Sequence, residues 1–267
     1  MKLSLFGLQT IGTPEDVAAN LVELRRAARA AKGRGGELLV TPELFITGYN
    51  IGDRVFELAQ DDLLSAVRAI ARDEKLALLV GLPIHVPASV GSEPATPERF
   101  YNCAVFIDET GAVLATYRKT HLYGSLDRYS FTPGDELVCT VDYRGVRLAL
   151  MICYDVEFAE VVRAAALAGA HALLVPTAQM SPFHYVAEQV VRVRAWENQV
   201  YVAYINHDGT EGDLDYVGRS SIVDPYATVL DSIEHGTGLI GAVIDTDVVE
   251  RAQRENPYLS YRRPTLY

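Results

Sequence analysis

The chain has 267 residues, of which 49% are hydrophobic and 22% are charged, and its formal net charge is −11. This composition supports a folded globular core and excludes an intrinsically disordered chain, and the negative charge argues against a general surface for nucleic acid or anionic membranes. The three cysteines form no CxxC pair, which disfavours a disulfide framework, and no apolar run approaches the ~20 residues of a membrane-spanning helix. We therefore expect a cytoplasmic protein that contacts neither nucleic acid nor a membrane.

Strand and helix patterns alternate along the first third of the chain. Thr13 is expected to cap the first helix, because Pro14 and two acidic residues follow it in the first turn. In chain order, the patterns predict a strand over 2–9, a helix from Thr13 to Gly33, a strand over 37–40, a helix over 54–72 and a strand over 77–81.

Hairpins appear in the second part of the chain, after a polar loop over 87–98. Turns at 109–111 and 143–145 predict that 100–108 pairs with 113–118 and that 137–141 pairs with 146–152. The remaining predicted elements are a helix over 158–168, a strand over 172–175, a helix over 185–197, strands over 201–205, 220–223, 228–232 and 239–245, and a helix over 245–254. Crossover helices together with hairpins favour an α/β fold with mixed sheets, packed with helices outside, over a purely parallel sheet.

Three of these strands end in reactive side chains. Glu43 follows a strand in "ELLVTPELFITGY", Lys119 follows one in "AVLATYRKTHLYG", and Cys153 follows one in "RLALMICYDVEFAE". Alone, each has an ordinary structural explanation as a loop acid, a surface lysine or a core thiol. Together they suit nucleophilic chemistry, because a thiol with a pKa of ~8.5 needs a base or a nearby cation. A carboxylate can accept its proton, and a lysine can stabilise the oxyanion formed when sulfur adds to a carbonyl or nitrile.

These motifs resemble those of the nitrilase superfamily of carbon–nitrogen hydrolases, in the same order and over nearly the whole chain. The downstream segments "PTAQM", "RAWENQVYVAYINHDG" and "GRSSIVDPYATVL" also resemble that family. The resemblance implies a catalytic triad in which Glu43 is the general base, Lys119 stabilises the oxyanion and Cys153 is the nucleophile. It further implies a four-layer αββα sandwich that pairs into a homodimer or a higher homo-oligomer.

One position departs from the family pattern. Many family amidases carry a second glutamate shortly after the lysine, and here Asp127 is the candidate for that place. The alternative is that Asp127 pairs with Arg128 or with a backbone amide.

Several residues near the three motifs have either a structural or a substrate-binding role. A helix start directly after Cys153 would offer its positive end and backbone N–H groups to an oxyanion. We interpret His121 as a hydrogen-bonded scaffold residue, since a carboxylate base is already available, and Asp155 and Glu157 as structural acids at the helix start or in ion pairs with Arg163 or Arg194. Residues that could shape the substrate pocket or the oxyanion site are Tyr154, Tyr49, Tyr123, Phe131 and Gln179.

The predicted protein is an amidase that hydrolyses small non-peptide carboxamides to acid and ammonia through a cysteine thioester. No cofactor is expected, and the histidines and cysteines show no metal-ligand spacing. Alternatives are a nitrilase or an N-carbamoyl amide hydrolase with the same triad, and a catalytically silent binding or scaffold homologue. We expect one carbon–nitrogen hydrolase domain over 1–267, in which 257–267 is a C-terminal tail and a candidate subunit contact.

Overall fold

The computed structural model describes residues 1–89 and 96–266. Residues 90–95 of the loop predicted over 87–98, and Tyr267 at the end of the tail, lie outside the described residues. Within the described ranges, no helix combines the length and the apolar character needed to cross a membrane.

A first six-stranded sheet has the strand order β14-β1-β2-β3-β4-β5. Strands β1, β2 and β3 run parallel, and β14, β4 and β5 join them in antiparallel pairs. The strands span Lys2–Gln9 (β1), Leu38–Val40 (β2), Ala77–Val86 (β3), Arg99–Ile107 (β4), Val113–Arg118 (β5) and Gly238–Asp245 (β14).

A second six-stranded sheet has the order β13-β12-β9-β8-β7-β6. Here β7, β8 and β9 run parallel and the flanking pairs are antiparallel. Its strands span Cys139–Tyr143 (β6), Val146–Leu150 (β7), Ala172–Thr177 (β8), Tyr201–Asn206 (β9), Ser220–Val223 (β12) and Val229–Ile233 (β13). The short strands Asp208–Glu211 (β10) and Leu214–Val217 (β11) form a separate hairpin.

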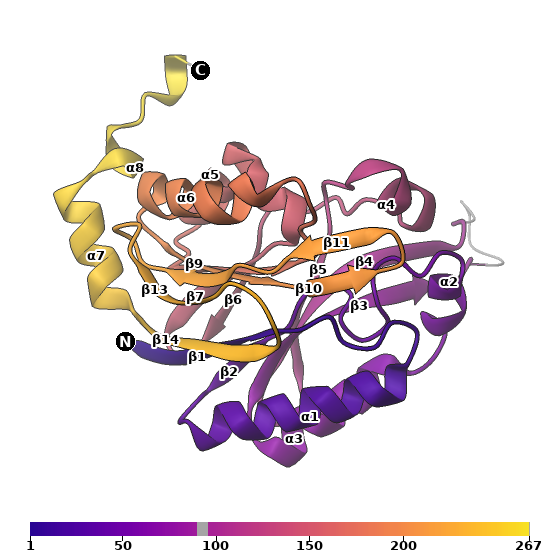
Figure 1. Cartoon of the computed structure of the whole chain (residues 1–267). Helices are drawn as coiled ribbons and strands as arrows, with labels where there is room; N and C mark the ends of the chain where they lie inside the picture. Colours follow the sequence, from indigo (N-terminus) through magenta and orange to yellow (C-terminus); the bar gives the residue numbers. More distant parts are fainter. Residues whose placement is uncertain (90–95, 267) are drawn as a thin grey trace.

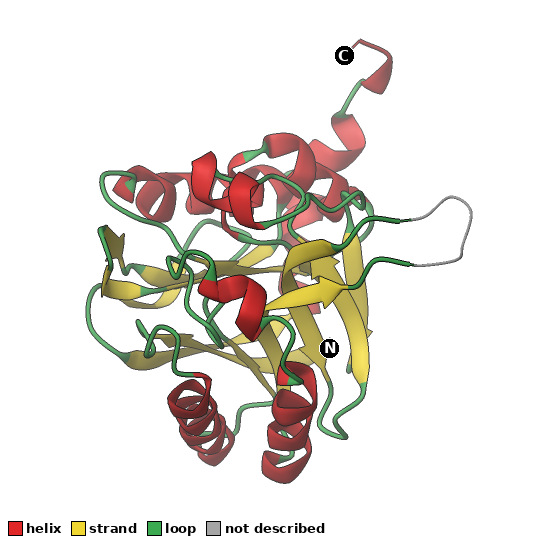
Figure 2. Ribbon diagram, turned by 90° about the vertical axis from the view of Figure 1, so that its right-hand side faces the viewer, coloured by secondary structure: helices red, strands yellow, loops and turns green. Residues whose placement is uncertain are grey.

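The two sheets pack face to face, and helices cover their outer faces (Figures 1 and 2). Helices α1 (Val17–Gly33) and α3 (Leu63–Glu74) lie on the first sheet, and α5 (Ala159–Leu167) and α6 (Val191–Asn198) lie on the second. Successive side chains along a strand point to opposite faces of the sheet. Leu5 and Leu79 therefore belong to the core between the two sheets, whereas Phe6 and Leu78 pack under α1 and α3. This is the predicted αββα sandwich with mixed sheets.

The remaining helices are short. They are α2 (Arg54–Leu58), α4 (Gly124–Ser130), α7 (Thr246–Glu255), α8 (Tyr258–Tyr261), the 3₁₀ turns η1 (Cys153–Glu157) and η3 (Pro264–Leu266), and the π-helical segment η2 (Val186–Val190) that leads into α6. The helix predicted over 185–197 is therefore η2 followed by α6, and α4 and the β10–β11 hairpin were not predicted.

Two other helix predictions need correction. Thr13 does not cap α1: Glu15 takes a positive φ of 66°, and Asp16 is the cap, accepting a hydrogen bond from the backbone N–H of Ala19. The helix predicted over 54–72 is divided into α2 and α3, because Asp62 caps a new helix by accepting from the N–H of Ser65. Both predicted hairpins are confirmed.

Candidate active site

The three strand ends singled out in the sequence meet at one place. Glu43 follows β2 and Lys119 follows β5, both in the first sheet, whereas Cys153 follows β7 in the second. The Nζ atom of Lys119 donates to Oε1 of Glu43 at 2.7 Å and to Oδ2 of Asp127 at 2.6 Å. The side chains of these three charged residues are completely buried. The fold thus assembles two carboxylates, one ammonium group and one thiol from four separate segments.

Glu43 is held from several sides. The side-chain amide of Asn102 donates to Oε1 of Glu43 at 2.7 Å, so this oxygen accepts two hydrogen bonds while Oε2 has no partner among the described residues. The imidazole of His207 lies 2.7 Å from the backbone carbonyl of Glu43. Gly81 on β3 permits this close packing, because a Cβ atom there would lie 2.5 Å from the backbone nitrogen of Leu44.

Asp127 lies in the first turn of α4. Its Oδ2 atom accepts from Lys119 and from the backbone N–H of Tyr123 at 2.9 Å, while Oδ1 has no partner in the described structure. Of the alternatives weighed from sequence, Asp127 therefore contacts a backbone amide, and its ion pair is with Lys119. The site contains two buried carboxylate oxygens, one each from Glu43 and Asp127, that are unpaired.

Cys153 adopts a left-handed backbone conformation with φ of 46°, which is unfavourable for a residue with a side chain and recurs at functional turns. The helix predicted over 158–168 is confirmed as α5, which starts at Ala159. The turn directly after the strand is not a regular helix start, because Cys153 begins the 3₁₀ turn η1. The reason is Asp155, whose carboxylate accepts from the backbone N–H of Ile152 at 3.0 Å and tightens the turn.

Asp155 has the structural role predicted from the sequence. Its buried carboxylate also accepts from the hydroxyls of Tyr117 at 2.9 Å and Thr120 at 3.0 Å, and from the backbone N–H of His121. The His121 ring lies 2.8 Å from the same carboxylate and stacks on Phe158, as expected of a scaffold histidine. This network ties the segment after Lys119 to the segment after Cys153.

The electrostatics of the site follow from its burial. Burial raises the pKa of Cys153 well above that of a free thiol, and the Glu43 charge adds to this effect, while Lys119 opposes it. Burial also raises the pKa of Glu43, against the pull of Lys119. Burial alone would lower the pKa of Lys119, but the Glu43 and Asp127 carboxylates outweigh it and hold the pKa well above its usual value. Burial thus favours the neutral form of the Cys153 thiol, whereas the two carboxylates favour the charged form of Lys119.

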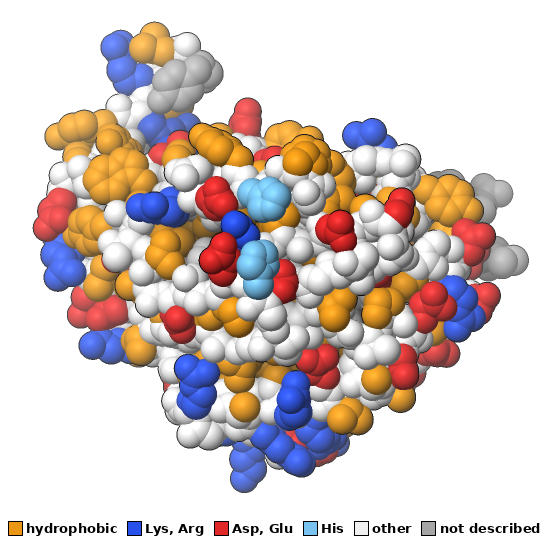
Figure 3. All heavy atoms as spheres, viewed as in Figure 1, with side chains coloured by type: hydrophobic (Ala, Val, Ile, Leu, Met, Phe, Trp, Pro, Cys, Tyr) orange, Lys and Arg blue, Asp and Glu red, His pale blue; other side chains and the backbone are white. Residues whose placement is uncertain are grey.

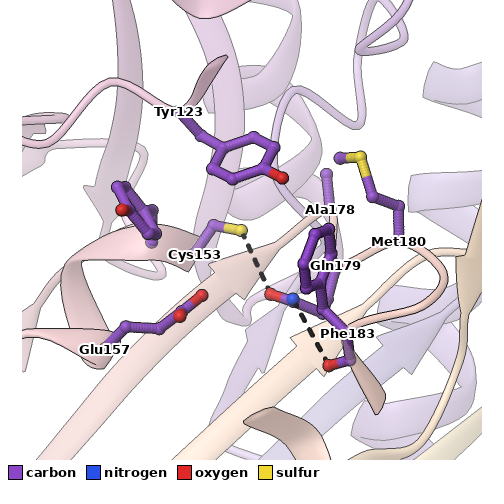
Figure 4. Close-up of a pocket in the computed structure, with 8 residues that line it drawn as sticks. Tyr123, Cys153, Glu157, Ala178, Gln179, Met180 and Phe183 are labelled. Atoms are coloured by element: carbon purple, nitrogen blue, oxygen red, sulfur yellow. Dashed lines mark hydrogen bonds between the residues drawn. The ribbon is translucent and has the colours of Figure 1, made fainter. Parts of the chain in front are cut away.

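A narrow pocket with a cavity volume of about 10 Å³ leads to Cys153 (Figure 4). In Figure 4 the Cys153 sulfur points toward the side chain of Gln179, whose Oε1 atom is 3.9 Å away. The residues that line the pocket are Tyr123, Cys153, Tyr154, Glu157, Ala178, Gln179, Met180 and Phe183.

The sequence identified only part of this lining. Tyr123, Tyr154 and Gln179 were predicted and line the pocket, whereas Tyr49 and Phe131 lie outside its lining. The Tyr49 ring is close to Lys119, whose Nζ is 5.8 Å from the ring centroid. Phe131 lines a neighbouring groove of about 480 Å³ beside the loop that carries Lys119.

Two residues of the site were missed or misread. Asn102 was overlooked, although a polar side chain in the middle of the apolar strand "FYNCAVFID" is a usable signal, since buried amides need partners. Glu157, interpreted as purely structural, lines the pocket beside Cys153. Among the described residues, no group of three His, Cys, Asp or Glu side chains could hold a metal ion.

Comparison with known proteins places these observations in a family. The carbon–nitrogen hydrolase family profile matches residues 2–254. The chain is 41% identical to the Pseudomonas protegens protein called "Hydrolase in pqqF 5'region", over 100% of this chain and 90% of that protein. It is 34% identical to an (R)-stereoselective amidase of a Pseudomonas species, over 100% and 93% of the two chains.

A solved structure agrees in fold. The crystal structure of an amidase from a Nesterenkonia species superimposes with a TM-score of 0.87 at 36% identity, covering 99% of this chain and 94% of that one. A mutant of that amidase in which alanine replaces a cysteine was solved in complex with butyramide. Another mutant carries the acetamide moiety of fluoroacetamide, added covalently at the active-site cysteine. The protein described here therefore belongs to the carbon–nitrogen hydrolase family, in the nitrilase superfamily indicated by its three motifs.

Proposed function

We propose that this enzyme is an amidase that hydrolyses small non-peptide carboxamides to the acid and ammonia. The observation that carries the proposal is the position of Lys119 between Glu43 and Asp127, beside a cysteine at the end of a small pocket. Lysine has three N–H donors, and two of them are used by these carboxylates. The third is available for an oxyanion, as the triad requires.

In the first half of the reaction, the Cys153 sulfur attacks the amide carbon and its proton passes to Oε2 of Glu43. The oxyanion is stabilised by Lys119 and by the backbone N–H of Tyr154. When the intermediate collapses, the C–N bond breaks and the nitrogen takes the proton from Glu43. Ammonia leaves, and the acyl group remains on Cys153 as a thioester.

In the second half, a water molecule attacks the thioester while Glu43 accepts its proton. The C–S bond breaks, the sulfur recovers that proton from Glu43, and the carboxylic acid is released. The unpaired Oε2 atom of Glu43 supports its role as the shuttle, because it is a buried acceptor with no partner in the described structure.

The unpaired carboxylate oxygens favour amides over nitriles. An amide nitrogen brings two N–H donors that can satisfy Oε2 of Glu43 and Oδ1 of Asp127, whereas a nitrile brings none. We assign to Asp127 this orienting role, in place of the second glutamate of many family amidases. N-carbamoyl amino acids fit less well, because their carboxylate would enter a pocket whose lining contains Glu157 and no lysine or arginine.

The pocket size and the relatives support a small substrate. A cavity volume of about 10 Å³ lies far below the ~300–1,000 Å³ typical of sites for drug-sized ligands. The Nesterenkonia amidase has been crystallised with acrylamide and with butyramide. Short aliphatic amides are therefore the substrates that we propose.

An ammonia-release screen tests this function. We expect acid and ammonia from propanamide and butanamide, and little or no reaction with butanenitrile or with an N-carbamoyl amino acid. Faster turnover of the nitrile or of the carbamoyl compound would assign the site to one of those reactions. Complete inactivity toward all three classes would favour a silent binding protein.

Activity should decline in acid at a higher pH than an ordinary glutamate would dictate. Glu43 must be unprotonated to accept the thiol proton, and burial raises its pKa. The acid limb of kcat/KM should therefore have its midpoint above the ~4.3 of a free glutamate. The measurement is the pH profile of butanamide hydrolysis, with circular dichroism at each pH to show that the fold persists. Full activity at a pH close to the pKa of a free glutamate would contradict the role of buried Glu43 as the base.

We also propose self-association and a cytoplasmic location. Large apolar side chains are exposed on α6, on α8 and in the tail, among them Trp196, Tyr258, Tyr261 and Leu266. Figure 1 shows the tail projecting from the body of the molecule, and Figure 3 shows hydrophobic side chains gathered near its base. Sedimentation of the full chain tests whether it forms a dimer. Sedimentation of a chain lacking 257–267 tests the tail contact, since a dimer that persists without the tail would show that the tail is not needed for the subunit interface. The cytoplasmic location was predicted partly from the lack of a disulfide pattern among the three cysteines. Cell fractionation that finds the protein outside the cytoplasm would contradict this prediction.

A further inference from the structure

Glu157 places a negative charge in the pocket that leads to Cys153. Its side chain comes from the last residue of η1 and, in Figure 4, reaches toward the space in front of the Cys153 sulfur. The Glu157 charge acts on Tyr123, another residue of the pocket lining. Burial is the largest cause of the raised pKa of Tyr123, and the Glu157 charge is the second largest. Glu43, Lys119 and Asp127, by contrast, are fully buried and do not line this pocket. The open side of the site therefore has its own acid.

Two cations, Arg194 and Lys119, act on the Glu157 carboxylate through space. The hydrogen bonds and ion pairs that these two residues make within the described structure go to other groups. Arg194, one of the two partners predicted from the sequence, directs its guanidinium to the backbone carbonyls of Val156 and Glu157 and to the carboxylate of Glu197. Lys119 is committed to Glu43 and Asp127. Burial raises the pKa of Glu157 by more than Arg194 and Lys119 lower it, and a cation bound at this carboxylate would also act to lower it.

The walls around Glu157 suit an organic cation. Tyr123 and Tyr154 meet edge to face with ring centroids 5.2 Å apart, and Phe183 packs edge to face on Tyr123 with centroids 6.2 Å apart. Aromatic rings attract ammonium groups through the negative potential of their faces. A cationic group of a substrate could therefore contact both the Glu157 carboxylate and the aromatic rings.

We infer that Glu157 is a specificity-determining residue that selects short carboxamides whose acyl chain carries a protonated amine. The inference rests on the proposed amidase function. The acyl chain is the relevant part of the substrate, because its amide nitrogen is directed to the buried carboxylates behind Cys153 and the chain extends into the lined pocket. A neutral acyl chain of the same length brings no positive charge to the Glu157 carboxylate.

A pair of substrates with equal numbers of non-hydrogen atoms tests the inference. 3-Aminopropanamide carries the ammonium group, and butanamide has a methyl group in its place. In Glu157→Gln, which keeps the shape and removes the charge, the ratio of kcat/KM for the amine over butanamide should fall by about 10- to 100-fold, as expected for a charge-assisted contact. The loss should appear mainly as a higher KM for the amine.

The matched control is Glu160→Gln, which removes the same charge from an exposed position three residues later that does not line the pocket. This variant should leave the ratio unchanged. An unchanged ratio in Glu157→Gln, with butanamide still hydrolysed, would overturn the role of Glu157 and leave the amidase function standing. If the wild-type enzyme hydrolyses neither amide, the proposed function itself fails, so the two failures are distinguishable.

Discussion

Replacing Cys153 by alanine is expected to abolish amide hydrolysis, with a loss of at least about 10⁴-fold in kcat. The sulfur is the atom that bonds to the acyl carbon, and among the residues lining the pocket none offers another nucleophile of comparable strength. The measurement is ammonia release from butanamide at saturating concentration. Removal of one small atom next to the open pocket should leave the fold intact.

Cys139→Ala is the matched control for this variant. Cys139 is a free, partly buried thiol at the start of β6, outside the pocket lining. Its loss should leave the rate nearly unchanged, because Cys139 does not line the pocket. Full activity in Cys153→Ala would contradict covalent catalysis by this residue.

Replacing Lys119 by methionine should damage both catalysis and stability. Catalysis loses a donor to the oxyanion, for which a decrease of about 10²–10³-fold in kcat is typical. Stability falls because Glu43 and Asp127 would face each other, fully buried, without the ammonium group that bridges them. Breaking a buried pair by removing one partner costs about 3–5 kcal/mol in the free energy of unfolding.

The pH dependence of that loss has a defined sign. In Lys119→Met the pKa values of the two buried acids would lie above their values in the unfolded chain, because a like charge and burial both disfavour ionisation. Protonation therefore favours the folded variant, and its stability deficit should shrink as the pH falls from 7 toward 5. Urea unfolding at the two pH values measures this, with Lys32→Met on the exposed surface of α1 as control. An equal deficit at both pH values would show that the Glu43–Lys119–Asp127 cluster does not control stability.

The sheets were predictable because their strands follow a simple pattern. The bounds predicted for β1, β5 and β12 agree with the structure to the residue, since apolar runs end there at turns or at polar residues. Helix ends were harder, because one side chain can decide them. Asp62 starts a new helix inside a stretch that reads as continuous, and α4 has seven residues and no apolar period to reveal it.

The candidate site was predictable where its residues end strands. Glu43, Lys119 and Cys153 stand at such ends, and the structure brings Asp127 to the same place through its contact with Lys119. Asn102 lies inside a strand, and only the pairing of β3, β4 and β5 places its amide beside Glu43. Glu157 was interpreted as a structural acid at the helix start or in an ion pair with Arg163 or Arg194, whereas the structure places it in the pocket lining and directs Arg194 to backbone carbonyls.

The central claim is that Cys153 carries the acyl group of the substrate as a thioester, and interception of that thioester tests it most directly. Hydroxylamine, about the size of the departing ammonia, is added during butanamide hydrolysis by the wild-type enzyme and by Cys153→Ala. The account predicts that the wild type forms butanohydroxamate in a share that rises with hydroxylamine, while Cys153→Ala forms neither hydroxamate nor acid. Butanoic acid as the sole product of the wild type at every hydroxylamine concentration would contradict it, because water would then attack the amide directly.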